Sequence, residues 1–255
     1  MKKKLIILSV VGALLLAPTF AFADSSSNVV DLEGKATYQV DKALNVEEVI
    51  DRAKKGISDL DIGSAVTEST YNIDGKEFDV KTYRTAKLVG REVNQSLRIS
   101  NVNESNEMNI YAISAAAVYD SSRSESKSDD SVSVTTYSTF YMAKSTDENG
   151  VFYGSLVSAN GGWRINDYTT PVSITAKKFR LGQNGMMRNG PTDSQSQGFA
   201  LGAGPGSFDH TLKYGWNPVA LGQKGLFKSM IGVITEAEIV VHGNSSKLVL
   251  INTYE

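Results

Sequence analysis

The stretch Asn72-Ile-Asp-Gly-Lys-Glu-Phe-Asp-Val-Lys81 joins two runs of β-prone residues through an Asp-Gly pair. Asp-Gly between such runs is the strongest short-range signal for a β-hairpin. After the turn, apolar Phe78 and Val80 alternate with charged residues, which is the period of a strand with one face in water. The chain from Ser64 onward therefore predicts antiparallel β-structure.

Strand-like segments continue to the end of the chain, and many short strands are typical of a sandwich. They are Val93–Val102, Met108–Tyr119, Val132–Met142, Val151–Val157, Val172–Leu181, Ile231–His242 and Lys247–Tyr254. Met108–Tyr119 is apolar on both faces, which predicts a central strand buried on two sides. We expect an antiparallel β-sandwich-like body over residues 64–255.

One helix is expected before this body. Asn45 and Glu48 have the spacing of a capping box, and apolar residues recur at helical spacing from Val46 to Ile57. Gly56 is suited to the position after the last turn. The fold class is therefore mainly β with one short N-terminal α-helix, from about Asn45 to Leu60, within a lead of residues 24–63.

The first residues have the layout of a secretory signal peptide. Three lysines precede the apolar run Leu5–Leu16, and Ala21-Phe-Ala23 offers small residues at a cleavage site. We expect residues 1–23 to be removed after Ala23. The rest would be released, to the medium in preference to a periplasm, and the composition suggests a bacterial exoprotein.

Composition narrows the classes of function. The 255-residue chain has no cysteine, so no disulfide contributes to its stability. Its formal net charge is −2 with acids and bases interspersed, which predicts no nucleic-acid binding. No motif predicts a cofactor or a metal site. Asp147 and Asn149 before Gly150 could offer oxygens to calcium, but the same letters form an ordinary hairpin turn, which we prefer.

Two segments are predicted as loops. Asp120–Ser131 has no apolar residue, which indicates a solvated connection. Gly182–Ser207 is rich in glycine and contains Pro191 and Pro205, so it is not expected to hold a continued strand ladder. Long loops of this kind often carry function.

The leading functional hypothesis is a non-catalytic extracellular protein that binds a glycan, a cell wall or another surface partner. Aromatic rings beside Gly- and Asn-rich loops could stack on sugar rings, while neighbouring polar groups bond the hydroxyls. The candidate ligand-binding residues are Trp163, Arg164, Asn166, Asp167, Tyr168, Tyr214 and Trp216. The alternative is that both tryptophans fill the core.

Two other functions stay open. Met108–Tyr119 and Val132–Met142 are long enough for transmembrane β-strands, so the chain could be a β-pore-forming, membrane-active protein. Glu236 and Glu238 lie on one face of a predicted strand, about 7 Å apart, where two carboxylates could hydrolyse a glycosidic bond. A solvent-facing role explains the same two residues. Oligomeric state is not indicated by the sequence.

Overall fold

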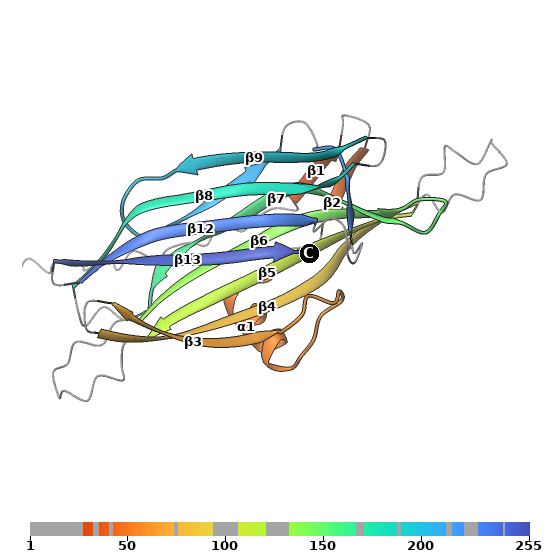
Figure 1. Ribbon diagram of the computed structural model, residues 1–255. Coiled ribbons are helices and arrows are strands. Elements are labelled where there is room, and N and C mark those ends of the chain that lie inside the picture. The colour runs from red at the N-terminus through yellow and green to blue at the C-terminus, as the bar shows by residue number, and fades with distance from the viewer. Residues whose placement is uncertain are drawn as a thin grey trace, which may run out of the picture.

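A computed structural model describes residues 28–32, 36–40, 43–73, 76–93, 107–120, 133–166, 171–187, 190–212, 216–221, 229–241 and 243–255. These residues form helix α1 (Val46–Lys54) and strands β1 to β13 (Figure 1). All their strand pairs are antiparallel, and two sheets pack together as a β-sandwich-like body. The predicted fold class is confirmed.

The large sheet has seven strands. Its order is β10 (Gly206–Thr211), β7 (Phe152–Ile165), β6 (Ser133–Thr146), β5 (Glu107–Asp120), β4 (Lys76–Val93) and β3 (Val66–Ile73), and β11 (Val219–Leu221) also pairs with β7. β3 and β4 pair with Ile73 opposite Lys76, as the Asp-Gly signal predicts. The strands β3 to β7 follow each other in space as in sequence, so hairpins build this sheet.

The small sheet has four strands and lies over the large one (Figure 1). Its order is β13 (Asn244–Tyr254), β12 (Met230–Val241), β8 (Val172–Met186) and β9 (Thr192–Ala200). β1 (Asn28–Leu32) and β2 (Ala36–Val40) form a separate two-stranded sheet in the polar lead, where no strand was predicted.

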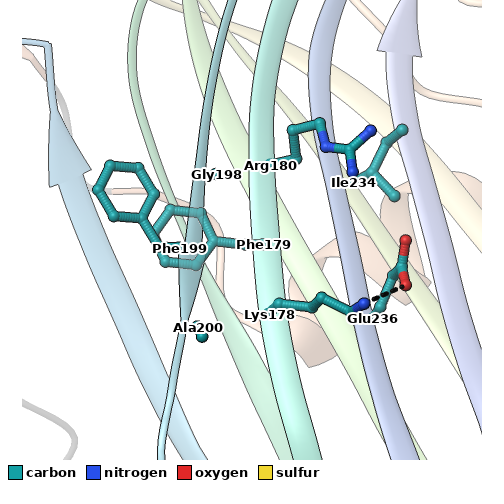
Figure 2. Close-up of a pocket in the computed structure, with 8 residues that line it drawn as sticks. All are labelled: Lys178, Phe179, Arg180, Gly198, Phe199, Ala200, Ile234 and Glu236. Atoms are coloured by element: carbon teal, nitrogen blue, oxygen red, sulfur yellow. Dashed lines mark ion pairs between the residues drawn. The ribbon is translucent and has the colours of Figure 1, made fainter.

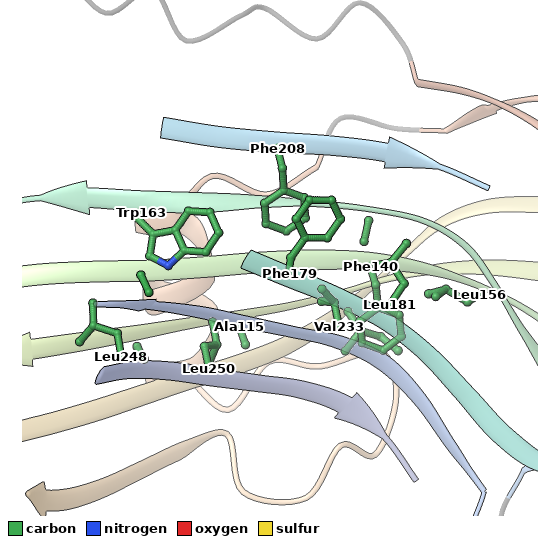
Figure 3. Packing of buried hydrophobic residues seen from close by; sticks show 14 of the residues in the cluster. Ala115, Phe140, Leu156, Trp163, Phe179, Leu181, Phe208, Val233, Leu248 and Leu250 are labelled. Atoms are coloured by element: carbon green, nitrogen blue, oxygen red, sulfur yellow. The ribbon is translucent and has the colours of Figure 1, made fainter. Parts of the chain in front are cut away.

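The main core lies between the two sheets (Figure 3). The large sheet contributes Phe140 and Leu156, and the small sheet contributes Leu181, Val233 and Leu250, all of them buried. Polar contacts also join the layers, because the Asn252 side-chain amide donates to the carbonyl oxygens of Ile113 and Ser138 on the large sheet. Apolar burial is the main force that holds two such layers together.

β5 is buried on both faces. Ile113 and Ala115 belong to the core between the sheets, Ala112 belongs to a second cluster on the opposite face, and Ala116 packs against helix α1. The continuous apolar pattern of this segment predicted a strand covered on two sides, and that prediction is confirmed.

Helix α1 covers part of the outer face of the large sheet. Asn45 is its N-cap and forms the predicted capping box, since the amide of Glu48 donates to Asn45 and the Glu48 carboxylate accepts from the Asn45 amide, each at 2.8 Å. The helix ends at Lys54, before Leu60, because Gly56 takes a left-handed conformation with φ of 65°.

The prediction of a long loop over Gly182–Ser207 is wrong. β8 continues to Met186, and β9 and β10 both begin inside the predicted loop. The two prolines that suggested a break, Pro191 and Pro205, each stand immediately before a strand, where a missing N–H removes no ladder bond. Residues 94–102 and 121–131, predicted as strand and loop, lie outside the described residues.

Candidate functional site

Trp163 does not offer a stacking surface in this structure, which corrects the binding hypothesis at this residue. Its side chain points into the core from β7, is 1% exposed, and lies 5.9 Å from the ring of Phe208 (Figure 3). Trp216 packs against the same core and is partly buried. The alternative prediction, that the tryptophans fill the core, fits this placement.

Of the other predicted binding residues, the two that the structure describes besides Trp216 form contacts with neighbouring elements. Arg164 points to the opposite face of β7 and forms an ion pair with Glu47 of the helix, with 2.7 Å between nitrogen and oxygen. The Asn166 side chain donates to Ser133 and Thr135 at the end of β6. Asp167, Tyr168 and Tyr214 lie outside the described residues.

The two carboxylates proposed for hydrolysis lie on the open face of the small sheet. Glu236 forms ion pairs with Lys247 at 2.9 Å and with Lys178 at 3.5 Å, and Glu238 is exposed. The hydrogen bond from Lys247 is the largest effect that lowers the pKa of Glu236. A general acid needs a raised pKa, so this environment does not favour glycoside hydrolysis.

The strands named in the pore-forming hypothesis occupy the centre of the large sheet. β5 and β6 pair without interruption from Asn109 opposite Lys144 to Asp120 opposite Ser133. Both faces of β5 contribute to buried clusters. Membrane insertion of this hairpin would therefore require the strands to leave both clusters.

The turn at Asp147 is an ordinary hairpin connection, the interpretation that we preferred to a calcium site. The Asp147 carboxylate accepts hydrogen bonds from the backbone amides of Asn149 and Val151, and Gly150 has a positive φ of 77°. These bonds are typical of an Asx-type turn. Among the described residues, no group of three or more acidic, histidine or cysteine side chains is placed to hold a metal ion.

A hollow of about 240 Å³ lies on the small sheet beside the β8–β9 pair (Figure 2). Gly198 and Ala200 of β9 stand opposite Arg180 and Lys178 of β8, so long basic side chains face positions with little or no side chain. The lining is completed by Phe179, Phe199, Ile234 and Glu236. Basic side chains therefore line one side of the hollow, and positions with little or no side chain line the other.

The basic side chains of the hollow differ in how they are paired. Lys178 shares Glu236 with Lys247, which lies closer to that carboxylate. Arg180 is exposed and has no ion pair or hydrogen bond from its guanidinium to any described residue. A planar guanidinium without a partner can take a carboxylate, phosphate or sulfate group through two parallel hydrogen bonds.

The sequence pattern did not predict this site because a β-bulge changes which side chains of β8 point to the solvent. The register between β8 and β12 shifts between Glu236 and Glu238, and Ala176 has a φ of 48°. Ile174 points inward before the bulge, and regular alternation from it would bury Lys178 and Arg180. The run Lys177-Lys-Phe-Arg180 was the available signal, but its orientation could not be read from the pattern.

Among the described residues, no helix is both long and apolar enough to span a bilayer. Comparison of the chain with protein-family models, with curated proteins and with solved structures gave no match.

Proposed function

We propose that this protein is a secreted, non-catalytic binding protein that holds an acidic glycan, of a cell wall or of the environment, on the open face of its small sheet. The observation that supports the proposal is the hollow between Lys178, Arg180 and Gly198, in which the Arg180 guanidinium has no partner among the described residues. A cation that is held on a rigid sheet and has no protein partner is suited to recognition of an anion.

The residues of the hollow have complementary parts in this proposal. The Arg180 guanidinium donates to a carboxylate or sulfate of the glycan, and Lys178, two residues away on the same face of β8, adds a second cation about 7 Å along the strand. Ile234 contacts the apolar face of a sugar ring. Gly198 and Ala200 allow the chain of sugars to approach the backbone of β9.

A lipid surface is the rival ligand for the same face. Ile251 is 56% exposed and Val249 is 36% exposed on neighbouring β13, and they stand opposite Ile234 and Glu236 of β12. We favour a glycan because the hollow is a discrete site with a cation at its edge. A flat bilayer surface would contact the apolar side chains of β13 instead.

The direct test is a binding titration of the purified protein with polygalacturonate, with neutral dextran as the comparison polymer. We expect saturable binding to the acidic polymer that weakens as salt is added, because ion pairs at an exposed face are screened. Dextran should not bind. Binding to vesicles of phosphatidylglycerol, without binding to polygalacturonate, would overturn the glycan proposal.

Arg180→Ala is the decisive variant. We expect its dissociation constant for polygalacturonate to rise at least about tenfold, because a hydrogen bond to a charged group typically contributes about 1.5–3 kcal/mol. Arg91→Ala is the matched control, since Arg91 is an exposed arginine of β4 on the large sheet, hydrogen-bonded to Asn109. Equal losses in the two variants would show that net charge alone drives binding, and would contradict a site at the hollow.

A further inference from the structure

Strand β9 forms one edge of the small sheet. It pairs with β8 over an unbroken register, from Lys178 opposite Ala200 to Met186 opposite Thr192. No described strand pairs with its other side (Figure 1), although His210 of β10 contacts the side chains of Gln197 and Phe199. Except for the Ser194 amide, which donates to the Asp193 carboxylate, the backbone groups on that side have no partner strand among the described residues and can pair with another extended chain.

β9 has only one of the features that usually prevent pairing at a sheet edge, the charge of Asp193. It reads Thr192-Asp-Ser-Gln-Ser-Gln-Gly-Phe-Ala200, with no lysine, arginine or proline, and its pairing with β8 has no bulge. The single charge, on Asp193, accepts hydrogen bonds from the backbone of Ser194 and the side chain of Gln195. By contrast, the opposite edge strand, β13, carries Lys247 in an ion pair. Natural proteins place charges, prolines or bulges at edges that must stay unpaired.

We infer that β9 is an interaction surface for a second copy of this chain, with the two β9 strands antiparallel about Ser196. That register places Gln195 opposite the partner copy's equivalent of Gln197, and Asp193 opposite the equivalent of Phe199. No like charges face each other along the pair, and like charges directly opposite would destabilise it. The pairing is self-complementary, as a two-fold symmetric dimer requires.

The dimer has a consequence for ligand binding, which rests on the proposed function. The two small sheets become one eight-stranded sheet, with both hollows on the same face because the two-fold axis is perpendicular to the sheet. Strand spacing and residue rise place the hollows about 20 Å apart. A repetitive acidic glycan can then occupy both hollows at once and bind more tightly than a short fragment.

Cysteine cross-linking tests the register directly, because the chain has no cysteine of its own. Ser196→Cys places one thiol at the symmetry axis, where opposed Cβ atoms lie about 4.5–5.5 Å apart, close enough for a disulfide after a small adjustment. Ser194→Cys is the matched control, since its two copies would be about 14 Å apart along the strands. Under mild oxidation we expect a covalent dimer from Ser196→Cys alone.

Sedimentation equilibrium measures the same contact without a cross-link. Ser196→Lys should raise the dimer dissociation constant by up to about fivefold, because it opposes two like charges at the axis. Ser173→Lys adds the same charge at an exposed position of β8 away from the edge and should leave dimerisation unchanged. A wild-type protein that is monomeric throughout, or a dimer that Ser196→Lys does not weaken, would overturn the inference.

Ligand binding separates this inference from the proposed function. If both hold, Ser196→Lys weakens binding to polygalacturonate but not to its trimer, because only the polymer can span two hollows. A monomeric wild type that binds both polymer and trimer equally would overturn the dimer and leave the hollow supported. A dimer that binds neither would leave the edge contact supported and overturn the proposed ligand.

Discussion

At the scale of single residues, Ala176 decides which side chains reach the open face. Its positive φ marks the bulge that turns Lys177 toward the core and Lys178 and Arg180 toward solvent. Lys177 is 6% exposed, and its amine lies 5.7 Å from the ring of Trp163. Burial lowers the pKa of that amine, because the charged form is less well solvated there. The same bulge directs Arg180 to the solvent.

Glycine residues give the first stability prediction at this scale. A Cβ added to Gly161 would lie 2.9 Å from two ring atoms of Phe208 and would also meet the backbone oxygen of Tyr137. We expect Gly161→Ala to lower the free energy of unfolding by about 1–3 kcal/mol, the usual cost of overpacking a core. Urea denaturation measures this change.

Gly198→Ala is the paired control for that prediction. An added Cβ there meets no atom within 4 Å, so the free energy of unfolding should change by less than about 0.5 kcal/mol. Equal destabilisation by the two substitutions would contradict the close packing at Gly161. Because Gly198 lines the hollow, the same variant should weaken binding to polygalacturonate without unfolding the protein.

At the scale of elements, helix α1 is fixed to the large sheet by both packing and hydrogen bonds. Val49 is buried against Ala116 of β5, and the Arg52 guanidinium donates to the Thr85 hydroxyl and the Ala86 carbonyl of β4. The capping box at Asn45 sets where this helix begins. Local sequence and tertiary contact therefore favour the same element.

Asn45→Ala tests the cap. The substitution leaves the amide of Glu48 without its side-chain acceptor, and we expect a loss of about 1 kcal/mol in the free energy of unfolding, measured by urea denaturation. Asn149→Ala, at an exposed turn position, is the matched control and should change the stability by less than about 0.5 kcal/mol. An effect of the same size in both variants would contradict the capping role.

At the scale of the whole molecule, two acidic residues join parts that are distant in sequence. Glu47 joins the helix to Arg164 of β7, and Glu236 joins β12 to Lys178 of β8 and Lys247 of β13. The hydrogen bond from Arg164 is the main cause that lowers the pKa of Glu47, and the bond from Lys247 does the same for Glu236. Both pKa values lie below the reference of 4.5.

These directions predict acid sensitivity. A carboxyl group whose pKa is lower in the folded state stabilises the fold fully above its unfolded pKa, and this stabilisation is lost as the pH falls through the folded value. We therefore expect the free energy of unfolding to fall as the pH decreases from about 5 to about 3. The stability of Glu236→Gln at neutral pH should be lower than that of wild type by less than about 1 kcal/mol, because the ion pairs are partly exposed.

Convergence at low pH is the signature to look for in urea denaturation curves. Wild type and Glu236→Gln should approach the same free energy of unfolding once Glu236 is protonated, because the ion pairs of Glu236 are then absent from both proteins. A difference that stays constant from neutral pH to acid would show that the substitution acts through packing instead.

The sequence alone determined the features that depend on neighbouring residues. The Asp-Gly turn, the capping box at Asn45 and the doubly apolar pattern of β5 all predicted what the structure contains. Turn chemistry, capping and periodicity act over a few residues, so the local sequence carries their signal. The mainly β class followed from the same short-range patterns.

Only the tertiary structure decided the sheet order, the existence of β9 as an edge, the burial of Trp163 and the facing of Arg180. Each depends on contacts between segments far apart in the chain. A polar segment such as β9 becomes a strand because β8 pairs with it along its whole length, and the bulge at Ala176 is fixed by pairing with β12. Such pairings lower the free energy of the folded chain, but they leave no local pattern in the sequence.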